Sequence, residues 1–212
     1  MDCERIQKKR KVTENTDKDI NIYPDLDNIK GQLVMADFPT HSAPQMKIDK
    51  GKVTNDKGYR LAKSSHGVWE GTWYFEVLVE NSLNGHVRIG WSQISGDLQA
   101  PCGYDVFSYS WRDAPGTLFH QSCPVKDAPF GYSGGFKPGD VIGVYIHLPP
   151  LTEANRQELE RRLWNPLVDK EYVQIRARPL QPLRNSEIRY FRNGIDMGVA
   201  FSPIYFGIFL IQ

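Results

Sequence analysis

Cysteine is scarce in this chain of 212 residues, which contains only Cys3, Cys102 and Cys123. An odd number of cysteines without a Cys-x-x-Cys spacing excludes a disulfide framework and a cysteine zinc site, and it favours a reducing compartment. The five histidines form no His-x-x-x-His pair, so we expect no bound metal and no cofactor. No signal peptide is visible and no apolar run reaches the roughly 18 residues that span a bilayer, so we expect no membrane partner.

The chain also lacks an excess of charge of either sign, since 26 Lys+Arg oppose 25 Asp+Glu and leave a net charge of +1. This balance provides no electrostatic argument for contact with DNA or with an acidic membrane. A charged partner must therefore bind to a local patch of the surface.

One local basic cluster, formed by Lys8, Lys9, Arg10 and Lys11, lies in a polar leader that spans residues 1–21. The leader has no apolar periodicity, so we predict that it is disordered. Basic runs of this kind are typical of nuclear import signals, and a solvated charged tail is the alternative interpretation. We therefore predict a nuclear protein, with these four residues as its import signal.

Hydrophobic residues make up 40% of the chain and aromatic residues 12%, which is enough for one large core. Short runs of β-branched and aromatic residues recur between Gly, Pro, Asn and Asp, a pattern that predicts an all-β sandwich or barrel over residues 22–212. Strands are expected at 45–48, 72–79, 86–91 and 141–148. Asn193-Gly194 predicts a tight hairpin turn, because both residue types tolerate positive φ, and the return strand should end near Phe201.

Two segments depart from the simple β pattern. Good helix formers and an acidic first turn from Thr152 to Trp164 predict a short helix, in an insertion of about residues 150–185 that we interpret as a surface excursion. Ile204 to Ile211 is apolar and Gln212 is the last residue. We expect a final strand there whose next pairing partner is missing, which would leave an unpaired sheet edge.

No arrangement of residues predicts catalysis. Hydroxyl groups stand beside His66 and His120, but neighbours on a strand point to opposite faces, so we interpret these histidines as structural. The segment from Ser133 to Phe136 is a turn, because no Gly-Lys-Ser/Thr follows it to bind phosphate. The acids in turn-like contexts are expected to accept hydrogen bonds from their own backbone rather than to form a glycosidase pair; they are Asp97, Asp105, Asp113 and Asp140.

The stretch from Arg88 to Gln121 has the composition of a protein-binding surface. Alternation places Val87 and Ile89 on one face of their strand, so Arg88 faces outward if the apolar pair faces the core. Arginine close to tyrosine and proline is typical of a hot spot, because guanidinium groups pair with carboxylates and flat rings supply contact area. We assign binding to Arg88, Tyr104 and Arg112, and we expect Trp91, Phe107 and Trp111 in the core.

Several segments together resemble a known family. Ser65-His66-Gly67-Val68 followed by GTWYFE at 71–76 resembles the opening of a SPRY domain. RIGWS at 88–92, LQAPCGYD at 98–105 and FSYSWR at 107–112 are similar to the SPRY domain of the Ash-two family ("absent, small or homeotic discs" two). The resemblance covers about residues 22–211, weakens in the insertion, and is most specific from Gln99 to Arg112. Members of this family are core subunits of the COMPASS-like complexes that methylate lysine 4 of histone H3.

The resemblance implies a two-sheet antiparallel sandwich with a pocket for an acidic segment of the complex's retinoblastoma-binding WD-repeat subunit. That pair of subunits then activates the SET-domain methyltransferase. Matched by motif, the pocket falls on Tyr59, Arg88, Pro101, Tyr104 and Arg112. The two arginines are expected to pair with carboxylates of the partner, and the other three residues to form packing walls. The implied function is a non-catalytic chromatin scaffold, not an enzyme.

The chain departs from the family pattern in three respects, one of which is that no zinc-finger or winged-helix module precedes the SPRY part. Ala114 stands where a lysine is common, and the loss of one rim charge should cost about 0.2–1 kcal/mol of binding. The chain also ends before the family's last strand and the helix that binds a small dimeric subunit, so we do not expect that subunit to bind here. The alternatives are a SPRY substrate-recognition module of a ubiquitin ligase and a lectin-like sugar-binding sandwich.

Overall fold

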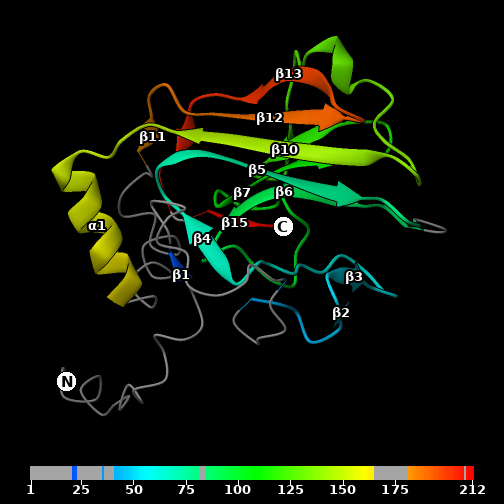
Figure 1. Ribbon diagram of the computed structural model, residues 1–212, viewed down its shortest axis with the longest axis horizontal. Helices are drawn as coiled ribbons and strands as arrows, with labels where there is room; N and C mark the ends of the chain where they lie inside the picture. The colour runs from blue at the N-terminus through cyan, green and yellow to red at the C-terminus, as the bar shows by residue number, and fades with distance from the viewer. Residues whose placement is uncertain (1–20, 23–34, 36–40, 82–84, 165–180, 208) are drawn as a thin grey trace, which may run out of the picture.

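Two β-sheets packed face to face form the body of the protein in the computed structural model (Figure 1). The structure describes residues 21–22, 35, 41–81, 85–164, 181–207 and 209–212. The basic leader, including Lys8 to Lys11, and most of the second half of the predicted insertion lie outside these residues. In the described part of the chain, no helix has the length and apolar character needed to cross a membrane.

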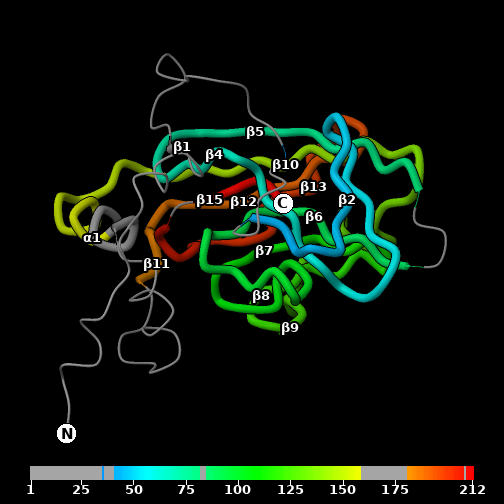
Figure 2. The backbone as a smooth tube through the Cα atoms, turned by 90° about the horizontal axis from the view of Figure 1, so that it is seen from below, coloured from blue at the N-terminus to red at the C-terminus, as the bar shows by residue number. Residues whose placement is uncertain are grey.

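The larger sheet has seven strands and the smaller one has four. The larger sheet runs in the order β1 (Asn21–Ile22), β4 (His66–Val68), β15 (Phe209–Ile211), β6 (Arg88–Gln93), β7 (Ser108–Arg112), β8 (Leu118–His120) and β9 (Cys123–Pro124). The smaller sheet runs in the order β13 (Ile195–Phe201), β12 (Glu187–Arg192), β10 (Val141–Leu148) and β5 (Gly71–Leu78). In Figure 2, β8 and β9 lie at one side of the molecule and β5 lies at the opposite side.

Two short ribbons and two short helices complete the described structure. They are β2 (Lys47–Asp49) with β3 (Lys52–Thr54), β11 (Pro182–Leu183) with β14 (Ile204–Tyr205), the 3-10 helix η4 (Phe130–Tyr132) and the helix α1 (Glu153–Trp164). The predicted all-β sandwich with a short helix is therefore confirmed. The expected antiparallel pairing is confirmed, since the pairs of described strands are antiparallel apart from the short parallel pair of β1 with β4.

The core lies between β6 and β7 of the larger sheet and β10 and β12 of the smaller one. Alternate residues of β10 point into it and are almost fully buried: Ile142, Val144, Ile146 and Leu148. Trp91 and Trp111 face them from the larger sheet, and the ring of Trp111 lies 4.9 Å from that of Phe136. These two tryptophans and Phe107 are buried, which confirms that all three are structural residues.

A hydroxyl group joins the two sheets inside this core. Tyr190 of β12 donates a hydrogen bond of 3.1 Å to the carbonyl oxygen of Ile89 in β6. The backbone N–H of Tyr190 in turn donates to the hydroxyl of Tyr132 at 3.2 Å. Because both tyrosines are buried, these bonds satisfy polar groups that water cannot reach.

The predicted hairpin joins β12 to β13. Asn193 and Gly194 both have positive φ, at 53° and 79°, as a two-residue type I′ turn requires. The Asn193 side chain accepts a hydrogen bond from the N–H of Val141 at 2.9 Å and donates one to Asp140 at 2.8 Å. The hairpin tip is therefore tied to β10, and β13 ends at Phe201 as expected.

The last apolar segment is not at a sheet edge, which contradicts the expectation of an unpaired final strand. β15 lies between β4 and β6 and pairs with both, and Phe209 and Leu210 are fully buried. A strand that is covered on both faces and paired on both sides must be apolar throughout, so its composition indicates a central strand. The carbonyl and N–H of Gln212 also pair with Gly90.

We predict that Tyr190→Phe lowers the free energy of unfolding by about 1 kcal/mol, because it removes the buried hydrogen bond that joins the sheets. Urea unfolding followed by tryptophan fluorescence measures this loss. Tyr145→Phe is the matched control, since Tyr145 lies on the outer face of β10 and its hydroxyl has no hydrogen bond among the described residues. An equal loss in the control would assign the effect to ring packing instead.

Candidate functional site

Two arginines lie side by side on the face of the larger sheet that points away from the core. Arg88 of β6 and Arg112 of β7 are direct partners in the antiparallel register, and both are partly buried. The Nε atoms of both side chains are buried and have no hydrogen-bond partner in the part of the chain that the structure describes. No carboxylate among the described residues forms an ion pair with either guanidinium group.

The Arg88 guanidinium is held between aromatic rings. Its Cζ atom lies 3.8 Å from the ring centre of Phe119 and 5.5 Å from that of Tyr59, and its Nη1 donates to the carbonyl oxygen of Cys102 at 3.0 Å. Burial lowers the pKa of Arg88, and the nearby charge of Arg112 acts in the same direction. An arginine stays protonated at neutral pH even so, and the site therefore concentrates positive charge.

The loop that joins β6 to β7 covers the sheet beside Arg88 and supplies Pro101 and Tyr104. The N–H of Tyr104 donates to the carbonyl of Pro101 at 3.0 Å, and the Tyr104 side chain is 52% exposed. Gly103 between them has φ of 79°, and a Cβ there would lie 2.5 Å from the Phe119 carbonyl. Only glycine lets the loop approach β8 this closely.

Polar side chains fix this loop at both ends. Lys63 is fully buried, and its Nζ donates to the carbonyls of Gln93, Ile94 and Gly96 at 2.8–3.0 Å. The carboxylate of Asp105 accepts from the N–H groups of Asp97 and Phe107 and from the hydroxyl of Ser108 at 2.8–2.9 Å. Pro101 and Tyr104 are therefore presented by a rigid segment rather than a loose one.

The structure brings the five predicted site residues into one region, and their role in binding stays a prediction. Tyr59 contacts Arg88, Arg112 lies opposite it, and the carbonyl of Cys102 ties Arg88 to the turn that carries Pro101 and Tyr104. The sequence interpretation missed Phe119, whose ring is the nearer of the two beside Arg88. Phe119 pairs with Ser110, and Ser110 lies two residues before Arg112 in β7. Because side chains alternate along a strand, this register could have placed Phe119 on the face of the sheet that carries Arg112.

The other polar residues that sequence analysis singled out have local structural partners. Asp97, Asp105 and Asp140 accept backbone N–H groups in turns, as predicted. Asp113 is an exception, because its buried carboxylate lies 3.1 Å from Nδ1 of His86 instead of serving its own backbone. The described residues contain no cluster of three or more His, Cys, Asp or Glu that could hold a metal ion.

Comparison with known proteins adds independent findings. Residues 72–149 match the family model of the SPRY domain. The chain is 38% identical over 176 residues to the "Set1/Ash2 histone methyltransferase complex subunit ASH2" of Drosophila melanogaster, a match that covers 78% of this chain and 31% of that protein. It is 37% identical over 184 residues to the corresponding subunit ash-2 of Caenorhabditis elegans, with the same coverage of both chains.

A shorter match is the "Set1 complex component ash2" of Schizosaccharomyces pombe, 40% identical over 109 residues, which covers 50% of this chain and 16% of that protein. A crystal structure of a human SPRY domain is 14% identical with a TM-score of 0.47, and the match covers 79% of this chain and 86% of that one. This chain spans about a third of the length of the fly and worm relatives, at 31% of each.

We predict that Arg112→Gln stabilises the free protein by about 0.5 kcal/mol, because like charges directly opposite each other in a sheet are destabilising. The gain should shrink in 1 M salt, which screens the repulsion. Denaturant unfolding at low and high salt measures both values. Arg184→Gln, at an exposed position, is the matched control and should change little. A salt-independent loss of stability in Arg112→Gln would contradict the repulsion.

Proposed function

Because this chain carries a SPRY domain and is related to the ASH2 subunits of Set1 complexes, we propose that it is a non-catalytic, protein-binding subunit of a nuclear histone H3 lysine-4 methyltransferase complex. The site formed by Arg88 and Arg112 binds an acidic segment of another subunit. The names of the relatives favour this function over a recognition module of a ubiquitin ligase.

The observation that carries the proposal is the pair of arginines with buried Nε–H groups that have no acceptor among the described residues. A buried donor without an acceptor costs free energy, and a charged donor costs more than a neutral one. A carboxylate placed between the two guanidinium groups supplies the missing acceptor and neutralises two like charges at once. Bidentate pairing of arginine with carboxylate makes such contacts strong and directional.

The surroundings of the arginines suit a peptide rather than a free anion. Tyr59 and Tyr104 are 39% and 52% exposed and offer flat rings on which an extended segment can pack. Pro101 adds a rigid apolar wall, and Phe119 holds the Arg88 guanidinium in place from the other side. Binding hot spots are typically composed of arginine side chains surrounded by aromatic rings.

Within the complex, the acidic segment belongs to the retinoblastoma-binding WD-repeat subunit. Binding of that subunit supports the activity of the SET-domain methyltransferase, while this chain contributes no catalytic residue of its own. The proposal needs no DNA contact, in line with the net charge of +1. Ala114 leaves the rim of the site with one cation fewer than a lysine would provide, so we expect moderate affinity.

We predict that Arg88→Glu and Arg112→Glu each weaken binding of an acidic peptide from the WD-repeat subunit by more than about 2 kcal/mol, or about thirtyfold. The reversal places a carboxylate against the carboxylates of the guest. Isothermal titration calorimetry at low and high salt measures the affinity, and the unchanged protein should bind less tightly as salt rises. Arg184→Glu carries the same change of net charge at an exposed position and serves as the control.

An equal loss of affinity in the Arg184→Glu control would show that net charge, and not the arginine pair, governs binding. Failure of the unchanged protein to bind at high micromolar peptide concentration would overturn the proposed site. Arg112→Lys adds a finer test, because an ammonium group keeps the charge but cannot pair with a carboxylate in a bidentate way. It should recover part of the affinity that Arg112→Glu loses.

The predicted import signal is tested separately. We expect deletion of Lys8 to Lys11 to reduce nuclear accumulation of a fluorescent fusion, since these four residues form the only basic run of the leader. Quantitative microscopy of the deleted and intact fusions measures the nuclear fraction. An unchanged nuclear signal would support the solvated-tail interpretation of the cluster.

A further inference from the structure

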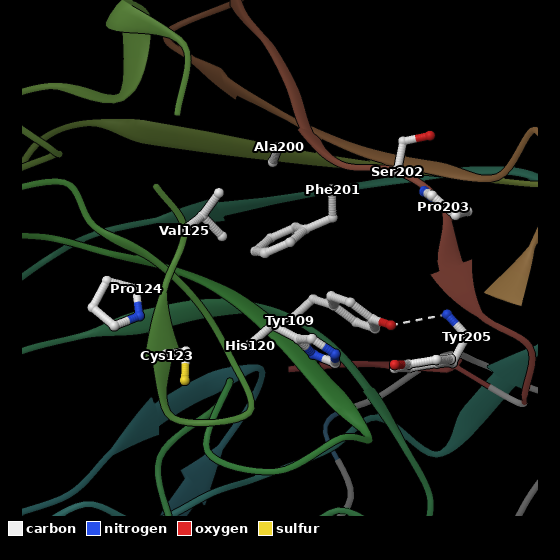
Figure 3. A pocket seen from close by; sticks show the side chains of 10 residues that line it. All are labelled: Tyr109, His120, Cys123, Pro124, Val125, Ala200, Phe201, Ser202, Pro203 and Tyr205. Carbon is white, nitrogen blue, oxygen red and sulfur yellow. Dashed lines mark hydrogen bonds between the residues drawn. The ribbon is translucent and has the colours of Figure 1, made fainter. Parts of the chain in front are cut away.

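A cavity of about 330 Å³ opens beside β8 (Figure 3). It lies on the face to which His120 points, opposite to the face on which Phe119 contacts Arg88. It lies where β8 and β9, at one edge of the larger sheet, approach the end of β13 and the start of β14. The rings of Tyr109, His120, Phe201 and Tyr205 line it, together with aliphatic groups such as Val125. We refer to this cavity as the β8–β9 pocket.

The polar groups of the β8–β9 pocket already have partners. Nδ1 of His120 lies 2.9 Å from the carbonyl of Ser108 and donates to it, while Nε2 accepts from the amide of Gln121 at 3.1 Å. Burial lowers the pKa of His120, so the ring is neutral at pH 7. The hydroxyl of Tyr109 accepts the N–H of Tyr205 at 2.9 Å.

The described residues that line the pocket include no Lys, Arg, Asp or Glu. A charged ligand would lose its hydration there without gaining a counter-charge, so the pocket favours an apolar guest. The ring of His120 stacks on that of Tyr109 with 4.1 Å between the ring centres. The ring of Phe201 lies 5.1 Å from the same Tyr109 ring, centre to centre, at an angle of 66° between the ring planes. Because these rings contact one another, they do not form an open cage for a cation. The volume is near the lower limit for ligand pockets, which suits one side chain better than a large molecule.

A single turn connects this pocket to the arginine pair. Phe119 and His120 are consecutive in β8, and they point to opposite faces, one beside Arg88 and the other into the pocket. In the turn that follows, the hydroxyl of Ser122 donates to the carbonyl of Tyr104 at 2.8 Å. The amide of Gln121 reaches the hydroxyl of Tyr205 at 3.4 Å. The turn therefore touches the candidate site on one side and the pocket on the other.

We infer that the β8–β9 pocket binds one apolar side chain of the same acidic segment that the arginine pair binds. This inference rests on the function proposed above and adds a second, chemically different anchor to it. A segment that passes from Arg88 across Tyr104 and over the Gln121–Ser122 turn reaches the mouth of the pocket. The arginines then select for acidic residues, and the pocket selects for an apolar residue beyond them.

Cys123 offers a way to block the pocket without touching the arginines. It is exposed on β9 and lines the pocket, whereas Cys102 is buried, and burial raises the pKa of the Cys102 thiol. In a Cys3→Ser background, N-benzylmaleimide should therefore react with Cys123. The thiol sulfur adds to one alkene carbon of the maleimide and a proton from water adds to the other, which places a bulky ring at the pocket mouth.

The experiment compares two synthetic peptides, one with the acidic segment and its flanking residues, and one in which the apolar flanking residues are replaced by serine. Labelling should weaken binding of the first peptide by about tenfold or more, the value expected for losing one buried aliphatic side chain. It should leave the weaker binding of the serine peptide unchanged. Cys123→Ser, treated with the same reagent, should keep the affinity that it has before treatment.

Cys123→Trp provides a second obstruction that needs no reagent, and thermal unfolding of each protein checks that it remains folded. The pocket inference is overturned if both peptides bind equally and neither the label nor Cys123→Trp changes their affinity. In that case the proposed function still stands, provided that Arg88→Glu abolishes binding. Binding that survives Arg88→Glu unchanged overturns the proposed function itself, and this inference with it.

Discussion

The packing of β6 and β7 against the smaller sheet is the constraint on which the rest of the structure depends. Ile89 and Trp111 must face the core, because their apolar side chains fill the space between the sheets. Side chains alternate along a strand, so Arg88 and Arg112 are forced onto the opposite face. The register of the two strands then places the two arginines directly across from each other. Burial of the core thus creates the concentration of positive charge.

This arrangement is unfavourable for the protein alone, and the proposed function gives it a purpose in binding. Like charges in register repel, and the two Nε–H groups have no acceptor among the described residues. The cost is tolerable because the inter-sheet core is large and the loop beside Arg88 is fixed by Lys63 and Asp105. In the proposed complex, acidic groups of the partner would remove the repulsion, so the feature that weakens the free domain would give the bound state its specificity. Proteins often accept local instability of this kind at functional sites.

Local patterns predicted the elements whose causes are local. Positive φ at Asn193 and Gly194 follows from residue type, the helix at Glu153–Trp164 follows from helix propensity, and the strand at 141–148 follows from its β-branched run. The position of the final apolar segment did not follow from its sequence. Its neighbours β4 and β6 come from residues 66–93, far earlier in the chain, so its pairing partners lie outside any local pattern.

The sequence by itself determined that Trp91, Phe107 and Trp111 belong to the core, that a tight turn falls at Asn193-Gly194, and that arginines, tyrosines and a proline gather between residues 88 and 112. Only the tertiary structure decided which of them touch. Phe119 reaches Arg88, and the carbonyl of Cys102 accepts its Nη1, because β8 and the preceding loop are folded against the same face of the sheet. Contacts across a sheet depend on strand order and register, and no local preference of one segment contains that information.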